Sequence, residues 1–75
     1  MQSNERNNNE LIGLTLLRMG QVCALTGLAR TTIYELQRDG LFPKRIKIGR
    51  ISVWIQREVI QWIESKISGS RGELP

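Results

Sequence analysis

The chain has 75 residues, enough for one domain, and 11 Lys and Arg against 7 Asp and Glu give a formal net charge of +4 at pH 7. A small basic domain favours nucleic acid as its partner and has little room for an enclosed active site. With one cysteine and no histidine, an intrachain disulfide and the common zinc sites are excluded, and no cofactor or enzyme activity is expected. No apolar run approaches the ~20 residues that span a bilayer, so a cytoplasmic protein is predicted.

Polar segments flank a patterned central segment. Residues 1–13 begin with an Asn-rich stretch without apolar periodicity, and they predict a disordered N-terminal arm. Residues 68–75, SGSRGELP, predict a disordered tail on similar grounds. The single folded domain is therefore expected over residues 14–67.

A short first helix is predicted over residues 21–26, directly after Gly20. Val22 and Leu25 are three residues apart, so their side chains are expected to face the same way. Gly27 suits the left-handed residue that ends many helices, so the chain is expected to turn there.

A second helix is predicted over residues 30–39, with Gly40 at its end. Its buried side, continued into the exit from the helix, consists of Ile33, Leu36, Leu41 and Phe42. A rotation of ~100° per residue places on the opposite face Thr31, Glu35 and Arg38, flanked by Arg30 and Tyr34. Two helices joined by a Gly-containing turn within this short span form the helix-turn-helix pattern.

A basic β-hairpin is predicted next, because Pro43 cannot continue a helix and fixes an extended path. Its strands are expected over residues 44–48 and 51–54, joined by a type II′ turn at Gly49-Arg50. The alternation typical of a half-buried strand is formed by Ile46 and Ile48 with Arg45 and Lys47. The tip of this wing is therefore expected to carry Lys47 and Arg50.

A last helix is predicted over residues 56–67, where it would cover the first two helices. Its apolar stripe consists of Val59, Ile60, Ile63 and Ile67. Trp54 and Trp62 are interpreted as core residues that hold the wing against this helix. The predicted fold class is mainly α with a small β-hairpin, a winged helix-turn-helix of three helices and a two-stranded wing.

The positive charge is concentrated in one part of the chain. Residues 30–57 contain seven basic and two acidic residues, a charge of +5, whereas the rest has four basic and five acidic residues, a charge of −1. Lys and Arg release counterions from duplex DNA, and a major groove ~12 Å wide admits one helix. The distribution therefore favours double-stranded DNA as the partner, with the second helix in the major groove.

Individual contacts follow from helix-turn-helix docking, in which the start of the second helix meets the base edges. Arg30 can pair with guanine and Thr31 can contact a thymine methyl or a phosphate. Contacts with the DNA backbone are expected for Arg38 and Lys44. Alternatives stay open for Tyr34, a DNA contact or half-buried packing, and for Glu35, an acceptor from cytosine or an ion-pair partner of Arg38.

Several short signals together resemble one known family. In chain order they are Gln21-Val22, Thr26-Gly27-Leu28, Thr32-Ile33-Tyr34, Gly40-Leu41-Phe42-Pro43, Lys47-Ile48-Gly49-Arg50, Trp54, Glu58-Val59 and Trp62-Ile63. Over residues 16–67 the chain is similar to the AlpA family of prophage regulatory proteins, a layout shared with MerR-like and excisionase winged helices. The resemblance implies a sequence-specific DNA-binding regulator of transcription in a prophage or integrated element.

The resemblance also implies which residues contact DNA. They are Arg30, Thr31, Thr32 and Tyr34 in the recognition helix, and Lys47 and Arg50 in the wing. The chain departs from the family pattern at Ala29, where a capping Ser is common, and at Glu35, where a basic or neutral side chain is common. Because Ala cannot accept the free N–H groups of the helix, a less firmly fixed helix start is expected.

Two other functions fit the same sequence. An excisionase-like directionality factor would use the same surface to bend attachment-site DNA. A protein-interaction module would show an exposed apolar stripe on the last helix. Since a single module buries little DNA surface, a dimer or cooperative multimer on DNA is expected, with integrase and RNA polymerase as further candidate partners.

Overall fold

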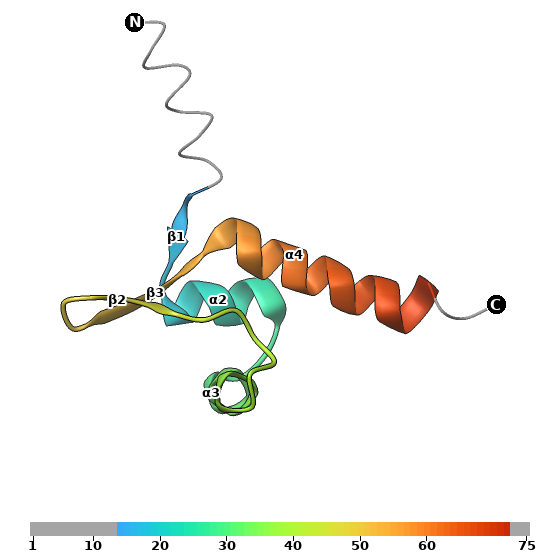
Figure 1. The fold of residues 1–75 in the computed structure, drawn as a ribbon, viewed down its shortest axis with the longest axis horizontal. Helices are drawn as coiled ribbons and strands as arrows, with labels where there is room; N and C mark the ends of the chain where they lie inside the picture. Colours follow the sequence, from blue (N-terminus) through green and yellow to red (C-terminus); the bar gives the residue numbers. More distant parts are fainter. Residues whose placement is uncertain (1–13, 73–75) are drawn as a thin grey trace, which may run out of the picture.

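Three α-helices and three short strands make up most of residues 14–72, the part of the chain that the computed structural model describes. The order is β1 (Leu16–Leu17), α2 (Met19–Thr26), α3 (Arg30–Arg38), β2 (Ile46–Ile48), β3 (Ile51–Ile55), α4 (Gln56–Ile67) and the π-helical turn η1 (Ser68–Gly72). Figure 1 shows α3 end-on below α2, with the β2–β3 hairpin and the far end of α4 projecting to opposite sides. The prediction of three helices with a β-hairpin is confirmed.

The first helix begins two residues earlier than predicted, and Gly20 lies inside it. The cause is a cap that the apolar pattern does not reveal, in which the Gln21 Oε1 accepts a hydrogen bond from the backbone N–H of Arg18 at 2.8 Å. This bond satisfies one of the donors that a helix start leaves free. The predicted end is correct, because Gly27 has a φ of 77° and its N–H bonds to the carbonyl of Cys23.

The turn between α2 and α3 is fixed by one side chain. The Thr26 hydroxyl donates to the carbonyl of Val22 at 2.8 Å and accepts from the N–H of Leu28 at 3.2 Å. Leu28, half-buried, then packs against the core. The two helices are therefore held at a set angle by local hydrogen bonds as well as by packing.

The hairpin is part of a three-stranded antiparallel sheet with the order β1-β3-β2, so the predicted two-stranded wing is incomplete. β1 pairs with the end of β3, where Leu17 lies opposite Trp54. At the other end, Gly49 has a φ of 62° and Arg50 has no positive φ, as a type II′ turn requires. β2 begins at Ile46 and not at Lys44, and β3 extends through Ile55.

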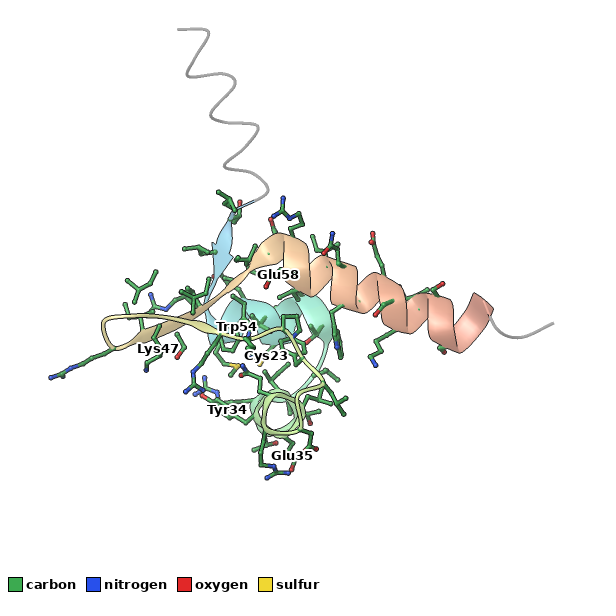
Figure 2. All side chains as sticks on the ribbon, in the orientation of Figure 1. Cys23, Tyr34, Glu35, Lys47, Trp54 and Glu58 are labelled. Atoms are coloured by element: carbon green, nitrogen blue, oxygen red, sulfur yellow. The ribbon has the colours of Figure 1, made fainter. Side chains whose placement is uncertain are left out.

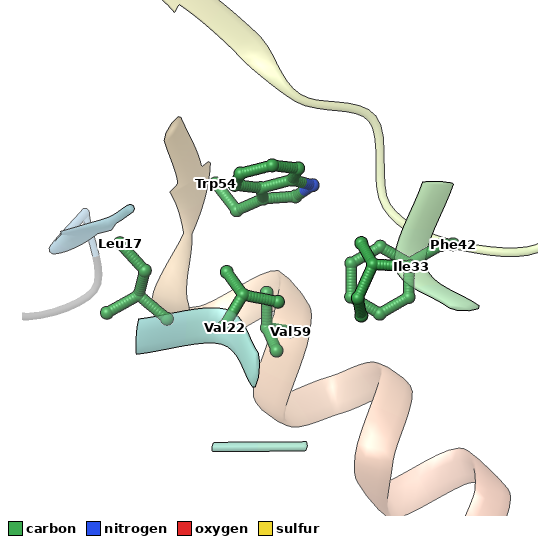
Figure 3. Close-up of a cluster of buried hydrophobic side chains, with 6 residues drawn as sticks. All are labelled: Leu17, Val22, Ile33, Phe42, Trp54 and Val59. Carbon is green, nitrogen blue, oxygen red and sulfur yellow. The ribbon is translucent and has the colours of Figure 1, made fainter. Parts of the chain in front are cut away.

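The core lies where the sheet meets the helices. Its buried side chains are Leu17, Val22, Ile33, Phe42, Trp54 and Val59. Figure 3 shows the Trp54 indole above Val22 and Val59, with Ile33 beside Phe42. Because Trp54 is fully buried, its interpretation as a core residue is confirmed. This cluster joins the hairpin to all three helices.

Several aliphatic residues with predicted core positions are exposed instead. They are Leu25, Leu41, Ile46, Ile48, Ile60 and Ile67. In a domain this small the core holds few side chains, and α4 runs past it, so that only Val59 and Ile63 of its stripe reach the cluster. Periodicity predicts which side of a helix is apolar, but it does not predict how many of the side chains on that side pack against the core.

Trp62 joins α4 to the segment that follows α3. Its indole Nε1 donates to the carbonyl of Leu41 at 2.7 Å, and its ring meets that of Phe42 edge-on at 4.8 Å between centroids. Beyond α4, η1 continues the helix where the sequence predicted a disordered tail from residue 68. Residues 73–75 and the predicted arm over residues 1–13 lie outside the described part of the chain.

Candidate nucleic-acid interface

One face of α3 is exposed along its whole length. Thr31, Tyr34, Glu35 and Arg38 are exposed, whereas Ile33 is fully buried. At ~100° per residue, Thr31, Glu35 and Arg38 lie opposite Ile33, which points into the core, and Tyr34 lies on the flank of this face. Figure 2 shows Tyr34 and Glu35 on α3 and Lys47 on the hairpin. The face that the sequence predicted is therefore exposed, with Tyr34 at 46%.

The start of α3 is open. Ala29 occupies the N-cap position with extended backbone (φ −73°, ψ 158°), and no side chain caps the helix. Arg30 follows at the first helical position and is exposed, so its side chain can reach past the helix end. Thr32 differs from the other predicted contacts, because it is half-buried and lies on the flank of α3 away from Tyr34.

The hairpin has two chemically different faces. Lys47 lies opposite Ser52 in the register, and Ser52 shares its face with Trp54, two residues further along β3. Since Trp54 packs in the core with Ile33 of α3, this is the sheet face that carries α3. Lys47 and α3 therefore lie on the same side of the sheet, with Arg50 at the turn that ends the hairpin.

The cations of this surface are exposed and mostly unpaired within the described chain. Among residues 14–72 there is one ion pair, between Arg38 Nε and Asp39 Oδ1 at 3.5 Å. The suggested pair of Arg38 with Glu35 is absent, and Arg38 pairs instead with Asp39, the next residue at the helix end. Lys44 is exposed in the segment between α3 and β2. Few contacts within the described chain would have to break for these side chains to meet phosphates.

One basic residue was not among the predicted contacts. Arg45 is exposed and precedes Lys47 by two residues, the spacing that places side chains on the same side of an extended strand. The same period-two pattern that predicted the strand could have indicated this position. Arg45 therefore extends the basic surface from the tip of the hairpin toward Lys44.

The exposed helix α3 has dimensions that suit binding in a groove. α3 is a helix of nine residues, and an α-helix with its side chains is about 10–12 Å across, which a DNA major groove about 12 Å wide admits. A shallow open pocket of about 370 Å³ is lined by Leu17, Gln21, Ala24, Leu25 and Gln56, none of which titrates. Within residues 14–72 no cluster of side chains could hold a metal ion, and no helix has the length and apolar character needed to cross a membrane.

Known proteins similar to this chain come from a bacteriophage and a bacterium. The family described as prophage CP4-57 regulatory protein (AlpA) matches residues 15–67. "Uncharacterized protein ORF88" of Enterobacteria phage P4 is 43% identical over 56 residues, 73% of this chain but only 64% of that protein. "DNA-binding transcriptional activator AlpA" of Escherichia coli (strain K12) is 34% identical over 65 residues, 77% of this chain and 93% of that protein. No solved structure gives a significant match.

Proposed function

Because the chain belongs to the AlpA family of prophage regulatory proteins, we propose that it is a DNA-binding transcriptional regulator of a prophage or integrated element. In this proposal α2, the turn and α3 form a helix-turn-helix, and the β2–β3 hairpin is its wing. The observation that carries it is the placement of the exposed face of α3 and of Lys47 on the same side of the sheet. A single duplex can then meet both at once.

The proposed contacts divide into two kinds. Arg30, Thr31 and Tyr34 read base edges in the major groove, and Arg30 has the geometry for a bidentate pair with guanine. Contacts with the DNA backbone or the minor groove come from Arg38, Lys44, Arg45, Lys47 and Arg50. Thr32, half-buried, contributes by packing the start of α3 more than by touching DNA. Specificity then resides in α3, and most of the electrostatic affinity in the wing.

The test is fluorescence anisotropy with duplexes that tile the DNA around the protein's own gene and the nearest integrase gene. We expect one tile to bind at least ~10³-fold more tightly than a scrambled duplex, and more weakly as salt rises. The position of that tile separates a promoter-bound regulator from an excision factor at an attachment site. Binding without preference for any tile would contradict sequence-specific regulation through these sites.

Matched variants assign the binding to the proposed surface. Arg30→Ala combined with Arg50→Ala removes two charges from α3 and the wing, and we expect it to abolish the preference. Arg57→Ala combined with Lys66→Ala removes two exposed charges from α4 and should keep it. Equal losses in the two double variants would mean that net charge alone drives the binding.

A further inference from the structure

Glu35 is an acidic residue within a basic segment. Residues 30–57 contain seven basic residues and two acidic ones, Glu35 and Asp39. Asp39 is paired with Arg38, whose Nε lies 3.5 Å from the Asp39 Oδ1. The Glu35 carboxylate, in contrast, makes no ion pair or side-chain hydrogen bond within residues 14–72. Its negative charge is therefore left uncompensated on the surface that carries the cations.

Glu35 also lies where the proposed recognition helix would meet DNA. It follows Thr31 by four residues, and a rotation of ~100° per residue places both side chains on the same face of α3, one turn apart. Figure 2, in which α3 is seen end-on, shows Glu35 on the side of the helix away from Trp54. The side chain is exposed. No contact within residues 14–72 therefore accounts for a carboxylate at this position.

A carboxylate on a DNA-binding helix is favoured by only some groups of the duplex. Phosphates repel it by like charge. In the major groove, guanine and thymine present the acceptors N7, O6 and O4, which oppose it as well. Adenine has a donor at N6 beside the acceptor N7, so a second carboxylate oxygen would face an acceptor there. Cytosine presents the N4 amino group as a donor, and this is the base that suits a carboxylate.

We propose that Glu35 is a specificity-determining residue that reads a cytosine in the major groove. A carboxylate oxygen accepts a hydrogen bond from cytosine N4, and its charge disfavours guanine or thymine at the same position. The inference rests on the proposed function, in which α3 lies in the major groove, and adds to it the base that one side chain selects. Arg30 and Glu35 then prefer opposite bases, because the first donates to guanine and the second accepts from cytosine.

The test is selection of tightly bound duplexes from a library with a randomised central segment, followed by sequencing. The full chain is compared with Glu35→Gln, because Gln has nearly the same shape but pairs with adenine N6 and N7. We expect one position of the selected sequence to change from cytosine to adenine. In anisotropy titrations of the two duplexes, wild type should prefer cytosine at least about fivefold, and Glu35→Gln should reverse the preference.

Two further variants separate base reading from charge and from folding. Glu64→Gln removes the same charge at an exposed position of α4 and should leave every selected base unchanged. Glu35→Ala should bind the cytosine and adenine duplexes equally, because it has no group that meets either base. Far-ultraviolet circular dichroism of each variant verifies that its helices are intact.

Three outcomes would overturn the inference while leaving the proposed function in place. They are the same selected sequence for wild type and Glu35→Gln, a change from a base other than cytosine, and a folded Glu35→Gln that selects no sequence at all. The last result would mean that Glu35 positions α3 without choosing a base. A wild-type chain that selects no sequence would instead contradict the proposed function, and this inference with it.

Discussion

Trp62 links α4 to the segment that leaves the proposed recognition helix. Its Nε1–H bond to the Leu41 carbonyl, at 2.7 Å, is joined by edge-on packing against Phe42. We expect Trp62→Phe, which keeps a ring but removes the donor, to lower the free energy of unfolding by about 1 kcal/mol in urea denaturation. Unchanged stability would mean that water replaces the indole at this carbonyl.

Gln37 places a polar atom in the interior without a partner. Its Oε1 is buried with no hydrogen bond, as is the Nε1 of Trp54. Burying an unsatisfied acceptor costs about 1–3 kcal/mol, and Met has a similar volume without that cost. We expect Gln37→Met to raise the free energy of unfolding by about 1 kcal/mol, measured by thermal and urea denaturation. A destabilised variant would show that the Gln37 amide has a partner in solution.

At the scale of elements, the missing cap of α3 is the clearest weakness. Ala29 already has the extended backbone of an N-cap residue, so Ala29→Ser needs no rearrangement to accept a helix N–H. We expect the substitution to raise the free energy of unfolding by about 1 kcal/mol in urea denaturation. Ala24→Ser, the same change at an exposed position within α2, should lower it by about 0.5 kcal/mol instead. A gain at both sites would exclude capping as the cause.

The elements that the sequence predicted well are those ended by a residue with a specific backbone requirement. Gly27 and Gly40 have φ values of 77° and 74° and end α2 and α3 as expected, and Gly49 forms the hairpin turn. Only glycine adopts such angles without strain, so a glycine that follows a segment with apolar periodicity indicates where that element stops. Gly20, which has no positive φ, lies inside α2 instead. The exposed side of α3 followed from the same logic, because a 3.6-residue period with Ile33 inside leaves one face outside.

The features that the sequence did not reveal depend on long-range partners. β1 has two residues, too few for any alternation, and it exists because β3 offers a free edge. The bond from Trp62 to Leu41 spans 21 positions, and no local pattern indicates it. The exposure of Ile48 was missed for a related reason, since alternation shows that a strand has two faces but not whether the apolar one is covered.

For the whole molecule, charge and apolar surface are divided between the two faces of one sheet. The sheet face toward α3 carries Lys47, while the opposite face of the β2–β3 hairpin carries Ile46, Ile48, Ile51 and Val53. In the proposed function the face with Lys47 is the one that meets a polyanion. Because the core of so small a domain leaves little room for an interior cavity, we expect its function to depend on surface residues.

The electrostatic consequence of this division is measurable as a salt dependence. Each phosphate neutralised by a cation contributes about −0.9 to the slope of log K against log [salt] for duplex DNA. Lys47, exposed and without an ion-pair partner, should account for one such contact. We expect Lys47→Gln to make the slope about 0.9 less steep and to weaken binding to specific and scrambled duplexes alike. Lys66→Gln at the far end of α4 should change neither. If the two variants gave the same slope, Lys47 would not touch a phosphate, and any contact of the wing with the DNA backbone would have to come from Arg45 and Arg50.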